Sequence, residues 1–341
     1  MFEHVKKVLS AEEASKRIPM TPDLIAVKSK RDAELKAIID GSDKRKVIII
    51  GPCSADNEDA VIDYVTRLAK LAEEVKEKFL LMPRIYTGKP RTKGEGYKGM
   101  MHTPDPHSHN TDIESGILHL RHMHIRAIRE SGLTSADEML YPDNLDYVID
   151  ILSYIAIGAR SCENQQHRLV ASGIDVPVGI KNPMNGSYGV LLNSIYAAQI
   201  SNEFKYGGYQ VKTSGNPYAH AVLRGSVNVH GNNIPNYHYE DVIRFSNEYI
   251  KQGLNNPAII IDTNHSNSGK NAYEQVRIAK EIFENMKYSD FNAVVKGLLV
   301  ESYIKDGNQN VLGCEYGKSV TDPCLGWEKT EALIKELADI I

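Results

Sequence analysis

The chain has 341 residues, a hydrophobic content of 42% and a formal net charge of −4 at pH 7, with four cysteines. This charge gives no general attraction to nucleic acid or to membranes, no apolar stretch is as long as a membrane span, and four cysteines do not make a disulfide scaffold. The N-terminal sequence MFEHVKKVLS lacks the apolar core of a signal peptide, so we expect a reduced, cytoplasmic protein.

Residues 1–45 precede the first predicted strand, and we expect them to form a helical N-terminal extension that can serve as an oligomer contact. Within it, KSKRDAELKAIIDG has helical periodicity and stops at Gly41. Residues 46–341 alternate between short apolar runs and helical stretches, which predicts a single catalytic domain. Helices are expected near residues 57–78, 113–131, 143–152, 163–173, 187–201, 239–252, 271–286 and 326–340.

Eight apolar runs each end in, or just before, a residue with a chemically functional side chain. These residues are Cys53, Arg84, Glu138, Arg160, Lys181, Arg224, His265 and Glu301. The runs are too short for buried helices and too apolar for surface loops, so they are typical of fully buried parallel strands. Eight strand-then-helix units predict a (β/α)8 TIM barrel, with an inserted segment around strand 6 and its chemistry at the C-terminal ends of the strands.

Three neighbouring strands of such a barrel carry potential metal ligands. Strands 7, 8 and 1 end in His265, Glu301 and Cys53, and the loop KSVTDPC adds Asp322. One thiolate, one imidazole and two carboxylates on one arc of the rim indicate a divalent-metal site. Taken alone, a cysteine at a strand end is more often a packing residue, and a histidine or glutamate is more often part of a hydrogen-bonded scaffold. The mixed donor set suits manganese, iron, cobalt or zinc without selecting among them.

A second arc is cationic. Strands 4, 5 and 6 carry Arg160, Lys181 and Arg224, and strand 2 adds Arg84, followed by Lys89 and Arg91. Cations that converge on one mouth repel each other unless they bind anions, and Arg suits phosphate and carboxylate. Their number predicts more than one phosphate, or a phosphate plus a carboxylate. The alternative is a salt-bridged rim, in which Glu138 neutralises one of the cations.

The long polar loop after strand 2 contains further histidines and aspartates, which form either a second metal site or, more simply, a solvated surface. They are His102, Asp105, His107, His109 and Asp112. Cys53 and Cys324 are expected to approach each other, because Asp322 is placed beside Cys53. A disulfide between them would remove a metal ligand.

Several segments resemble class I 3-deoxy-D-arabino-heptulosonate 7-phosphate (DAHP) synthases, in order from about residue 44 to the C-terminus. The matching segments are GPCS, KPRT, GARSCENQQHR, PVGIKN, LRG, DTNHSNSGK, VESYIKDGNQ and YGKSVTDPCLGWE. KPRT is the most specific, since the related 3-deoxy-manno-octulosonate 8-phosphate synthases carry an asparagine-containing version. The resemblance implies a metal-dependent barrel enzyme, a transferase of aromatic amino acid biosynthesis. Such an enzyme condenses phosphoenolpyruvate with erythrose 4-phosphate and water, releases phosphate and opens the shikimate pathway.

The resemblance also implies roles for individual residues. The metal ligands would be Cys53, His265, Glu301 and Asp322. Phosphoenolpyruvate would contact Arg84, Lys89, Glu138, Ala159, Arg160, Lys181 and Arg224. Erythrose 4-phosphate would lie along Lys89, Pro90, Arg91 and Thr92. The residues with catalytic roles would be Lys89, Arg91 and Arg160. A homodimer or homotetramer is expected, with no nucleic-acid or membrane partner.

The chain departs from the family pattern where regulated relatives bind an inhibitory amino acid. The hairpin segment NEFKYGGYQ is shortened, and Asp175 stands where those enzymes carry a small polar or neutral residue. We therefore expect weak or absent feedback inhibition. SVNVHGNNIPNYHYED after strand 6 is longer than usual. Two alternative functions are an octulosonate synthase, which accepts a different aldose, and a non-catalytic sugar-phosphate-binding barrel.

Overall fold

The computed structural model describes residues 1–91, 96–104, 111–313 and 315–341. Its central feature is one eight-stranded parallel sheet with the order β2-β1-β12-β11-β8-β5-β4-β3. A parallel bridge between Arg84 and Ala136 joins the two outermost strands and closes the sheet into the predicted (β/α)8 barrel. The strands are β1 (Lys46–Gly51), β2 (Phe79–Pro83), β3 (Ala136–Glu138), β4 (Tyr154–Ile157), β5 (Val178–Lys181), β8 (Ala219–Leu223), β11 (Ile259–Asp262) and β12 (Val295–Glu301).

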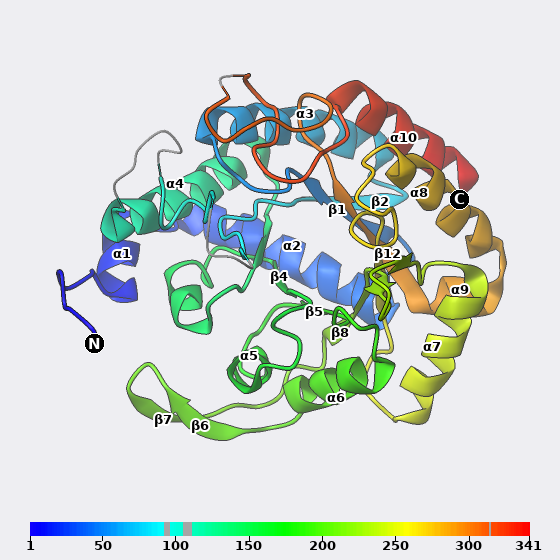
Figure 1. Cartoon of the computed structure of the whole chain (residues 1–341), viewed down its shortest axis with the longest axis horizontal. Coiled ribbons are helices and arrows are strands. Elements are labelled where there is room, and N and C mark those ends of the chain that lie inside the picture. Colours follow the sequence, from blue (N-terminus) through cyan, green and yellow to red (C-terminus); the bar gives the residue numbers. More distant parts are fainter. Residues whose placement is uncertain (92–95, 105–110, 314) are drawn as a thin grey trace.

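Helices surround the barrel on its outside (Figure 1). The α-helices in the described ranges are α1 (Ala11–Arg17), α2 (Pro22–Asp40), α3 (Glu58–Val75), α4 (Ile113–Ser131), α5 (Gln165–Ala171), α6 (Tyr188–Gln199), α7 (Tyr239–Lys251), α8 (Glu274–Glu284), α9 (Ser289–Val294) and α10 (Trp327–Ile340). Two short 3-10 helices, η1 (Pro142–Tyr147) and η2 (Asn285–Lys287), complete the set in the described ranges. None of the described helices is long and apolar enough to cross a membrane.

Most predicted helices are confirmed, but one is wrong. The segment predicted as a helix near 143–152 forms only η1, because Pro142, Asp143 and Asn144 favour a turn over continued helix. The short helix α9 was not predicted. Helix α3 is capped by Asn57, whose side chain accepts a hydrogen bond from the backbone of Ala60.

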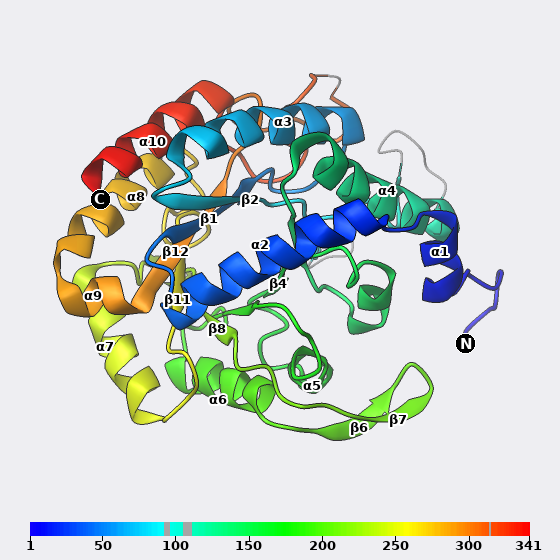
Figure 2. The same ribbon diagram turned by 180° about the vertical axis from the view of Figure 1, so that it is seen from behind.

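The second helix of the N-terminal extension forms the floor of the barrel. Figure 2 shows α2 lying across the end of the barrel opposite to the strand C-termini. Leu35, Ile38 and Ile39 belong to the same apolar cluster as Val47 and other inward-facing residues of the strands. Helix α2 therefore completes the interior core, while the predicted role of residues 1–45 in oligomer contacts stays a prediction.

Side chains along each strand alternate between two apolar layers. Val47 and Ile49 of β1 face the barrel interior, while Ile48 and Ile50 pack against the surrounding helices. The same alternation runs along the other strands, with Leu299 of β12 facing inward. A side chain two positions beyond an inward-facing residue therefore points into the mouth of the barrel.

Two hairpins are added to the barrel plan. Strands β6 (Glu203–Tyr206) and β7 (Tyr209–Lys212) form a hairpin after α6, in the segment predicted to be shortened. Strands β9 (Ser226–Val227) and β10 (Asn233–Ile234) form a second hairpin in the longer segment after β8, the sixth barrel strand. A hydrogen bond of 2.8 Å from the backbone nitrogen of Val227 to the carbonyl of Met184 ties this hairpin to the loop after β5.

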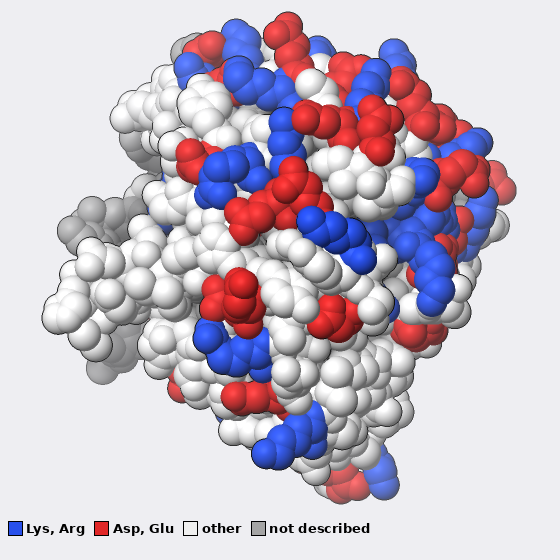
Figure 3. Space-filling model, turned by 90° about the vertical axis from the view of Figure 1, so that its right-hand side faces the viewer, with Lys and Arg blue, Asp and Glu red and all other residues white. Residues whose placement is uncertain are grey.

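On the face shown in Figure 3, acidic and basic side chains are interspersed. Pairs such as Lys280–Glu336 and Lys335–Glu331, with N–O distances of 2.7 Å and 2.8 Å, bring opposite charges together. The mixture agrees with the small net charge and gives this face no single sign.

A buried histidine lies inside the barrel. Tyr154 Oη and His220 Nε2 are 3.1 Å apart, and a Cβ on Gly179 would lie 1.8 Å from the Tyr154 hydroxyl. Glycine is therefore required at that position of β5. Burial lowers the pKa of His220 from its ordinary value of 6.5 to about 4.

The lowered pKa of His220 predicts a loss of stability in mild acid. Between pH 6.5 and pH 4 the unfolded chain binds a proton at this histidine and the folded chain does not, so stability falls as the pH falls. The loss between pH 7 and pH 5 is about 2 kcal/mol by linkage. His220→Gln should remove that part of the pH dependence. Urea unfolding of both proteins at the two pH values measures it, and equal losses in both would contradict the assignment.

Candidate active site

A cavity opens at the C-terminal ends of the barrel strands, with about 320 Å³ accessible to water. Its described lining includes seven Lys and Arg side chains but only two carboxylates, Glu138 and Asp322. The excess of positive charge makes the cavity suited to anions. The lining contains Arg84, Lys89, Pro90, Arg91, Glu138, Ala159, Arg160, Lys181 and Arg224 of the predicted substrate contacts. Thr92 lies outside the described residues.

The alternation of the strands explains why these side chains meet. Arg84, Lys181 and Arg224 each lie two residues beyond a position that faces the interior on β2, β5 and β8. Glu138 and Glu301 likewise lie two residues beyond the inward-facing Ala136 of β3 and Leu299 of β12. Each buried strand therefore delivers its last inward-facing side chain to the same mouth.

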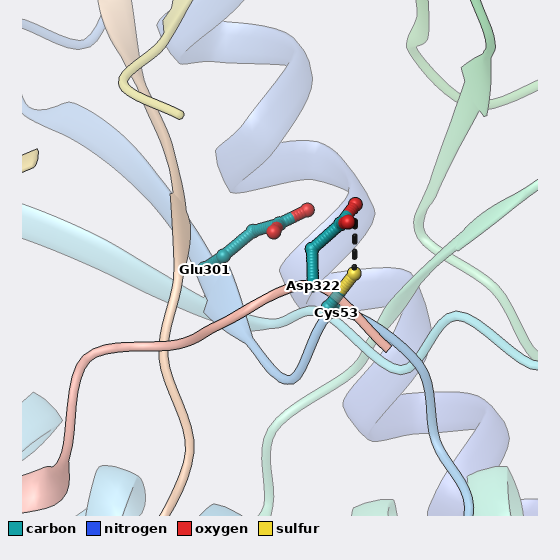
Figure 4. A group of neighbouring side chains, drawn as sticks. All are labelled: Cys53, Glu301 and Asp322. Atoms are coloured by element: carbon teal, nitrogen blue, oxygen red, sulfur yellow. Dashed lines mark hydrogen bonds between the residues drawn. The ribbon is translucent and has the colours of Figure 1, made fainter. Parts of the chain in front are cut away.

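Three of the four predicted metal ligands form a compact group (Figure 4). One ligand atom each of Cys53, Glu301 and Asp322 lies within 4.8 Å of the others. Cys53 Sγ is 3.7 Å from Asp322 Oδ2. The fourth, His265, has its Nε2 atom 4.0 Å from Glu301 Oε1. A soft sulfur, an imidazole nitrogen and carboxylate oxygens at this spacing fit a divalent transition metal.

The orientation of His265 is set by a carboxylate behind it. His265 Nδ1 lies 2.9 Å from Asp262 Oδ2, which leaves Nε2 directed at Glu301. Such a carboxylate–histidine pair is the usual support of a metal-bound imidazole. The neighbouring carboxylate of Glu301 is also held in place, because Asn264 Nδ2 donates a hydrogen bond of 2.6 Å to its Oε2 atom.

Lys89 reaches from the cationic arc into this group. Its Nζ is 2.7 Å from Cys53 Sγ and 3.8 Å from Asp322 Oδ2. Burial would lower the pKa of Lys89, but Cys53, Glu301 and Asp322 outweigh burial and raise it. Burial alone would raise the pKa of Asp322, but the positive charges of Lys89 and Lys270 outweigh burial and lower this pKa to about 2. The ammonium and the carboxylate therefore both stay charged at neutral pH.

The thiol of Cys53 behaves differently. Burial raises the pKa of Cys53, Glu301 adds to the effect, and Lys89 opposes it. Without another cation the group is a neutral thiol, and a divalent ion is the kind of charge that removes its proton. The predicted approach of Cys324 is confirmed, because the backbone nitrogen of Cys53 donates to Cys324 Sγ at 3.3 Å. Both cysteines are free thiols.

The cations around the cavity differ in their partners. Arg84 is 3% exposed, forms a 3.0 Å ion pair with Glu301 and has its guanidinium 3.8 Å from the ring centre of Tyr86. Lys181 pairs with Asp262 at 3.0 Å. Arg224 is also buried, and burial lowers its pKa. Arg160 is exposed at the rim. The rim is thus only partly salt-bridged, and positive charge remains for ligands.

The turn after β4 is shaped around Glu138. A Cβ on Gly158 would lie 2.5 Å from Glu138 Oε1, so a larger residue at this position would displace the Glu138 carboxylate. Ala159 and Arg160 follow directly and line the cavity.

Several residues of the site were missed from the sequence. Asp262, Tyr86 and Lys270 were not predicted, although Lys270 Nζ donates to Asp322 Oδ1 at 3.1 Å. Asp262 ends the apolar run AIIID at the inward parity, and that signal could have identified it. Tyr86 carries no such signal, because it follows the end of β2 in a segment without regular structure.

The suggested second metal site gains no support from its described members. Asp112 caps α4 by accepting from the backbone of Ser115 at 3.3 Å, and His102 lies 6.0 Å from the ring of Tyr141. Asp105, His107 and His109 lie outside the described residues.

Comparisons with known proteins agree with the geometry. A model of the DAHP synthetase I family matches residues 22–335. The Phe-sensitive phospho-2-dehydro-3-deoxyheptonate aldolase of Escherichia coli strain K12 is 35% identical over 353 residues, covering 100% of this chain and 96% of that protein. The Tyr-sensitive enzyme of Salmonella typhimurium strain LT2 is 36% identical over 310 residues, covering 88% of this chain and 83% of that protein.

A solved structure is similar over its full length. The phospho-2-dehydro-3-deoxyheptonate aldolase from Francisella tularensis SCHU S4 has a TM-score of 0.92 and 30% identity, covering 100% of this chain and 98% of that one. Its similarity extends over the N-terminal helices as well as the barrel. The chain belongs to the DAHP synthetase I family.

Proposed function

We propose that the cavity at the strand C-termini is the active site for the reaction of this family, with one divalent metal ion as its cofactor. The reaction condenses phosphoenolpyruvate with erythrose 4-phosphate and water to give DAHP and phosphate, the first step of aromatic biosynthesis, and the enzyme is a transferase. The observation that carries the assignment is the position of Lys89. Its Nζ lies beside Cys53 and Asp322 of the proposed metal group, and the same residue also lines the cationic cavity.

The metal would be held by Cys53, His265, Glu301 and Asp322, with Asp262 orienting the histidine. A bound divalent ion supplies a Lewis acid for the aldehyde oxygen of erythrose 4-phosphate. The donor set suits manganese, iron, cobalt or zinc.

The cations would hold the two phosphorylated substrates on opposite sides of Lys89. Phosphoenolpyruvate carries a carboxylate and a phosphate, which match Arg84, Lys181, Arg224 and Arg160. The phosphate of erythrose 4-phosphate would lie against Arg91, whose Nε donates to the carbonyl of Tyr97 at 2.8 Å, and beside Pro90 and Thr92. Ala159 and Glu138 would complete the phosphoenolpyruvate contacts.

Charge then directs the chemistry. The nucleophile is C3 of phosphoenolpyruvate, which forms the new carbon–carbon bond to the aldehyde carbon. Lys89 would give a proton to the aldehyde oxygen, because it is charged and would lie between the two proposed substrate positions. Water adds at C2, and phosphate leaves against the charges of Arg160, Lys181 and Arg224.

We further propose a cytoplasmic enzyme that works as a homodimer or homotetramer. Both proposals rest on the composition and on membership of the family rather than on a contact in the structure.

The first test is phosphate release with both substrates and added manganese. Turnover should require both substrates, stop after thorough chelation and return with several divalent metals to different degrees. Cys53→Ala should lose metal affinity and rate while its circular dichroism stays that of the folded barrel. Full activity in protein that elemental analysis shows to be metal-free would refute the metal assignment.

The same assay separates the alternatives. Arabinose 5-phosphate in place of erythrose 4-phosphate should give little turnover, since KPRT is the version of the motif found in DAHP synthases. Faster turnover with arabinose 5-phosphate would favour an octulosonate synthase. Tight binding of both sugar phosphates without phosphate release would favour a non-catalytic barrel.

The two substrate positions predict different effects of two arginine substitutions. Arg224→Ala removes a charge-assisted hydrogen bond to phosphoenolpyruvate worth about 1.5–3 kcal/mol. The KM for phosphoenolpyruvate should therefore rise, or kcat/KM fall, by about ten- to a hundredfold. Arg91→Ala should mainly raise the KM for erythrose 4-phosphate. If Arg91→Ala impaired only phosphoenolpyruvate, the two substrate positions would have to be exchanged.

Feedback inhibition by phenylalanine, tyrosine or tryptophan should be weak or absent. Asp175 is fully exposed and its 3.1 Å pair with Lys36 lies at the surface, so its carboxylate stays available to repel the carboxylate of an amino-acid ligand. In the shortened hairpin, the Tyr206 hydroxyl lies 2.9 Å from the Pro142 carbonyl and 3.0 Å from Asp146 Oδ1, which holds the hairpin over η1. Initial rates at subsaturating substrate with each amino acid at millimolar concentration test this, and strong inhibition by any of them would refute it.

A further inference from the structure

A buried carboxylate lies outside the cavity, behind its wall. Asp137 is the middle residue of β3 and is 4% exposed. Its neighbours Ala136 and Glu138 face the barrel interior and mouth, so Asp137 faces the layer between the strand and α4. Apolar residues such as Leu120 and Met123 fill that layer. A carboxylate there is costly unless hydrogen bonds satisfy it.

Asp137 is satisfied by donors from three segments. Its Oδ1 accepts from the backbone nitrogens of Thr87 at 2.9 Å and Glu138 at 2.7 Å. Its Oδ2 accepts from Thr87 Oγ1 at 2.5 Å and lies 3.3 Å from His124 Nε2 of α4. The other nitrogen of His124 lies 2.8 Å from Ser135 Oγ, which orients the ring. Two of these contacts go to Thr87 alone.

Thr87 is the start of the segment that carries Lys89. The carbonyl of Thr87 accepts from the backbone of Met100 at 2.7 Å, and the backbone of Lys89 donates to Lys98 at 3.2 Å. Gly88 and Gly99 form an antiparallel bridge between these two contacts. A Cβ on Gly99 would lie 2.3 Å from the Thr87 carbonyl, so the two strands of this turn are in close contact. A shift of Thr87 would therefore move the backbone of Lys89 as well.

We propose that Asp137, oriented by His124 and Ser135, is a positioning residue that sets the place of Lys89 in the active site through Thr87. The same carboxylate also accepts a hydrogen bond from the backbone of Glu138. It therefore fixes the distance between Lys89, which reaches the metal group, and Glu138, which belongs to the phosphoenolpyruvate wall. The proposal rests on the proposed function and adds a residue that touches neither substrate.

The barrel does not need Asp137 for its closure. The bridge between Arg84 and Ala136, together with a 2.9 Å hydrogen bond from Ile85 to the Ala136 carbonyl, already joins β2 to β3. The two contacts of Asp137 with Thr87 lie beyond that joint, on the segment that leads to Lys89. These two hydrogen bonds therefore act on the loop rather than on the closure of the sheet.

The decisive variant is Thr87→Val, which keeps the shape of the side chain and removes only the hydroxyl bond to Asp137. We expect kcat to fall by about ten- to a hundredfold, because a small misplacement of a catalytic group has an effect of that order. The KM for phosphoenolpyruvate should stay within about twofold, since Arg224, Lys181 and Arg160 come from other strands. Thr87→Ser restores the hydroxyl and should recover most of kcat.

The matched control is Thr213→Val. The Thr213 hydroxyl likewise bonds a neighbouring side chain, Ser172 Oγ at 2.7 Å, and it accepts from the backbone nitrogen of Asn202 at 2.9 Å. Thr213 directly follows β7, however, and does not belong to the segment that carries Lys89. A purely structural role for Thr87 would lower Tm in both variants and leave kcat unchanged at a temperature well below Tm. That result, or a failure of Thr87→Ser to recover kcat, would overturn the proposal.

Asp137→Asn provides a second route if Thr87→Val does not fold. It preserves the size of the side chain but replaces one acceptor oxygen by a donor, so it should lower kcat in the same way. Its KM for phosphoenolpyruvate should rise as well, because Asp137 also holds the backbone of Glu138. Unchanged kcat in folded Asp137→Asn would also overturn the proposal. Turnover by the unsubstituted enzyme tests the proposed function separately, so these outcomes are read only against an active parent.

Discussion

The ion pair between Arg84 and Glu301 is the contact around which the active site is organised. Both groups are nearly excluded from water and lie 3.0 Å apart, on strands separated by β1. Removing one partner of such a pair leaves a buried unpaired charge, which costs about 3–5 kcal/mol. Burial raises the pKa of Glu301, but Arg84 outweighs it and keeps the group a carboxylate. Glu301 is then available to a metal on one side while Arg84 faces the anion site on the other.

The cavity is arranged so that positive charge is supported but not cancelled. Asp262 pairs with Lys181 and His265, and Tyr86 lies under the guanidinium of Arg84. These contacts come from behind the cations and leave their remaining donors directed at the mouth. The repulsion among the cations in the free enzyme is relieved when two phosphorylated substrates enter, which makes ligand binding favourable at the moment the site fills.

The barrel and most of its functional side chains could be predicted because short buried strands must expose their last inward residue at one end. Glu301 and Arg224 followed from that rule alone, whereas Cys53 lies two residues beyond the end of β1 and followed from its nearness to a strand end. Tyr86 and Lys270 could not be found that way, since each lies in a loop whose path depends on contacts far away in the sequence. The segment after β3 was misjudged as a helix because its apolar spacing was helical, while its proline and aspartates favoured a turn. The packing of α2 against the end of the barrel could not be predicted either, because helical periodicity does not indicate what the apolar face of a helix contacts.

The joint between β2 and β3 gives the fold a distinctive weak point. Five residue pairs register β1 with β2, whereas in the described residues one register pair, Arg84 with Ala136, joins β2 to β3, and the bonds of Thr87 with Asp137 lie just beyond it. The residue that completes the ring of strands is thus the same one that faces the anion site. Local opening of the sheet at this joint would dismantle the binding site before the rest of the core loosened. A half-finished barrel would consequently be inert, and affinity for substrate would appear together with closure of the ring as one cooperative event.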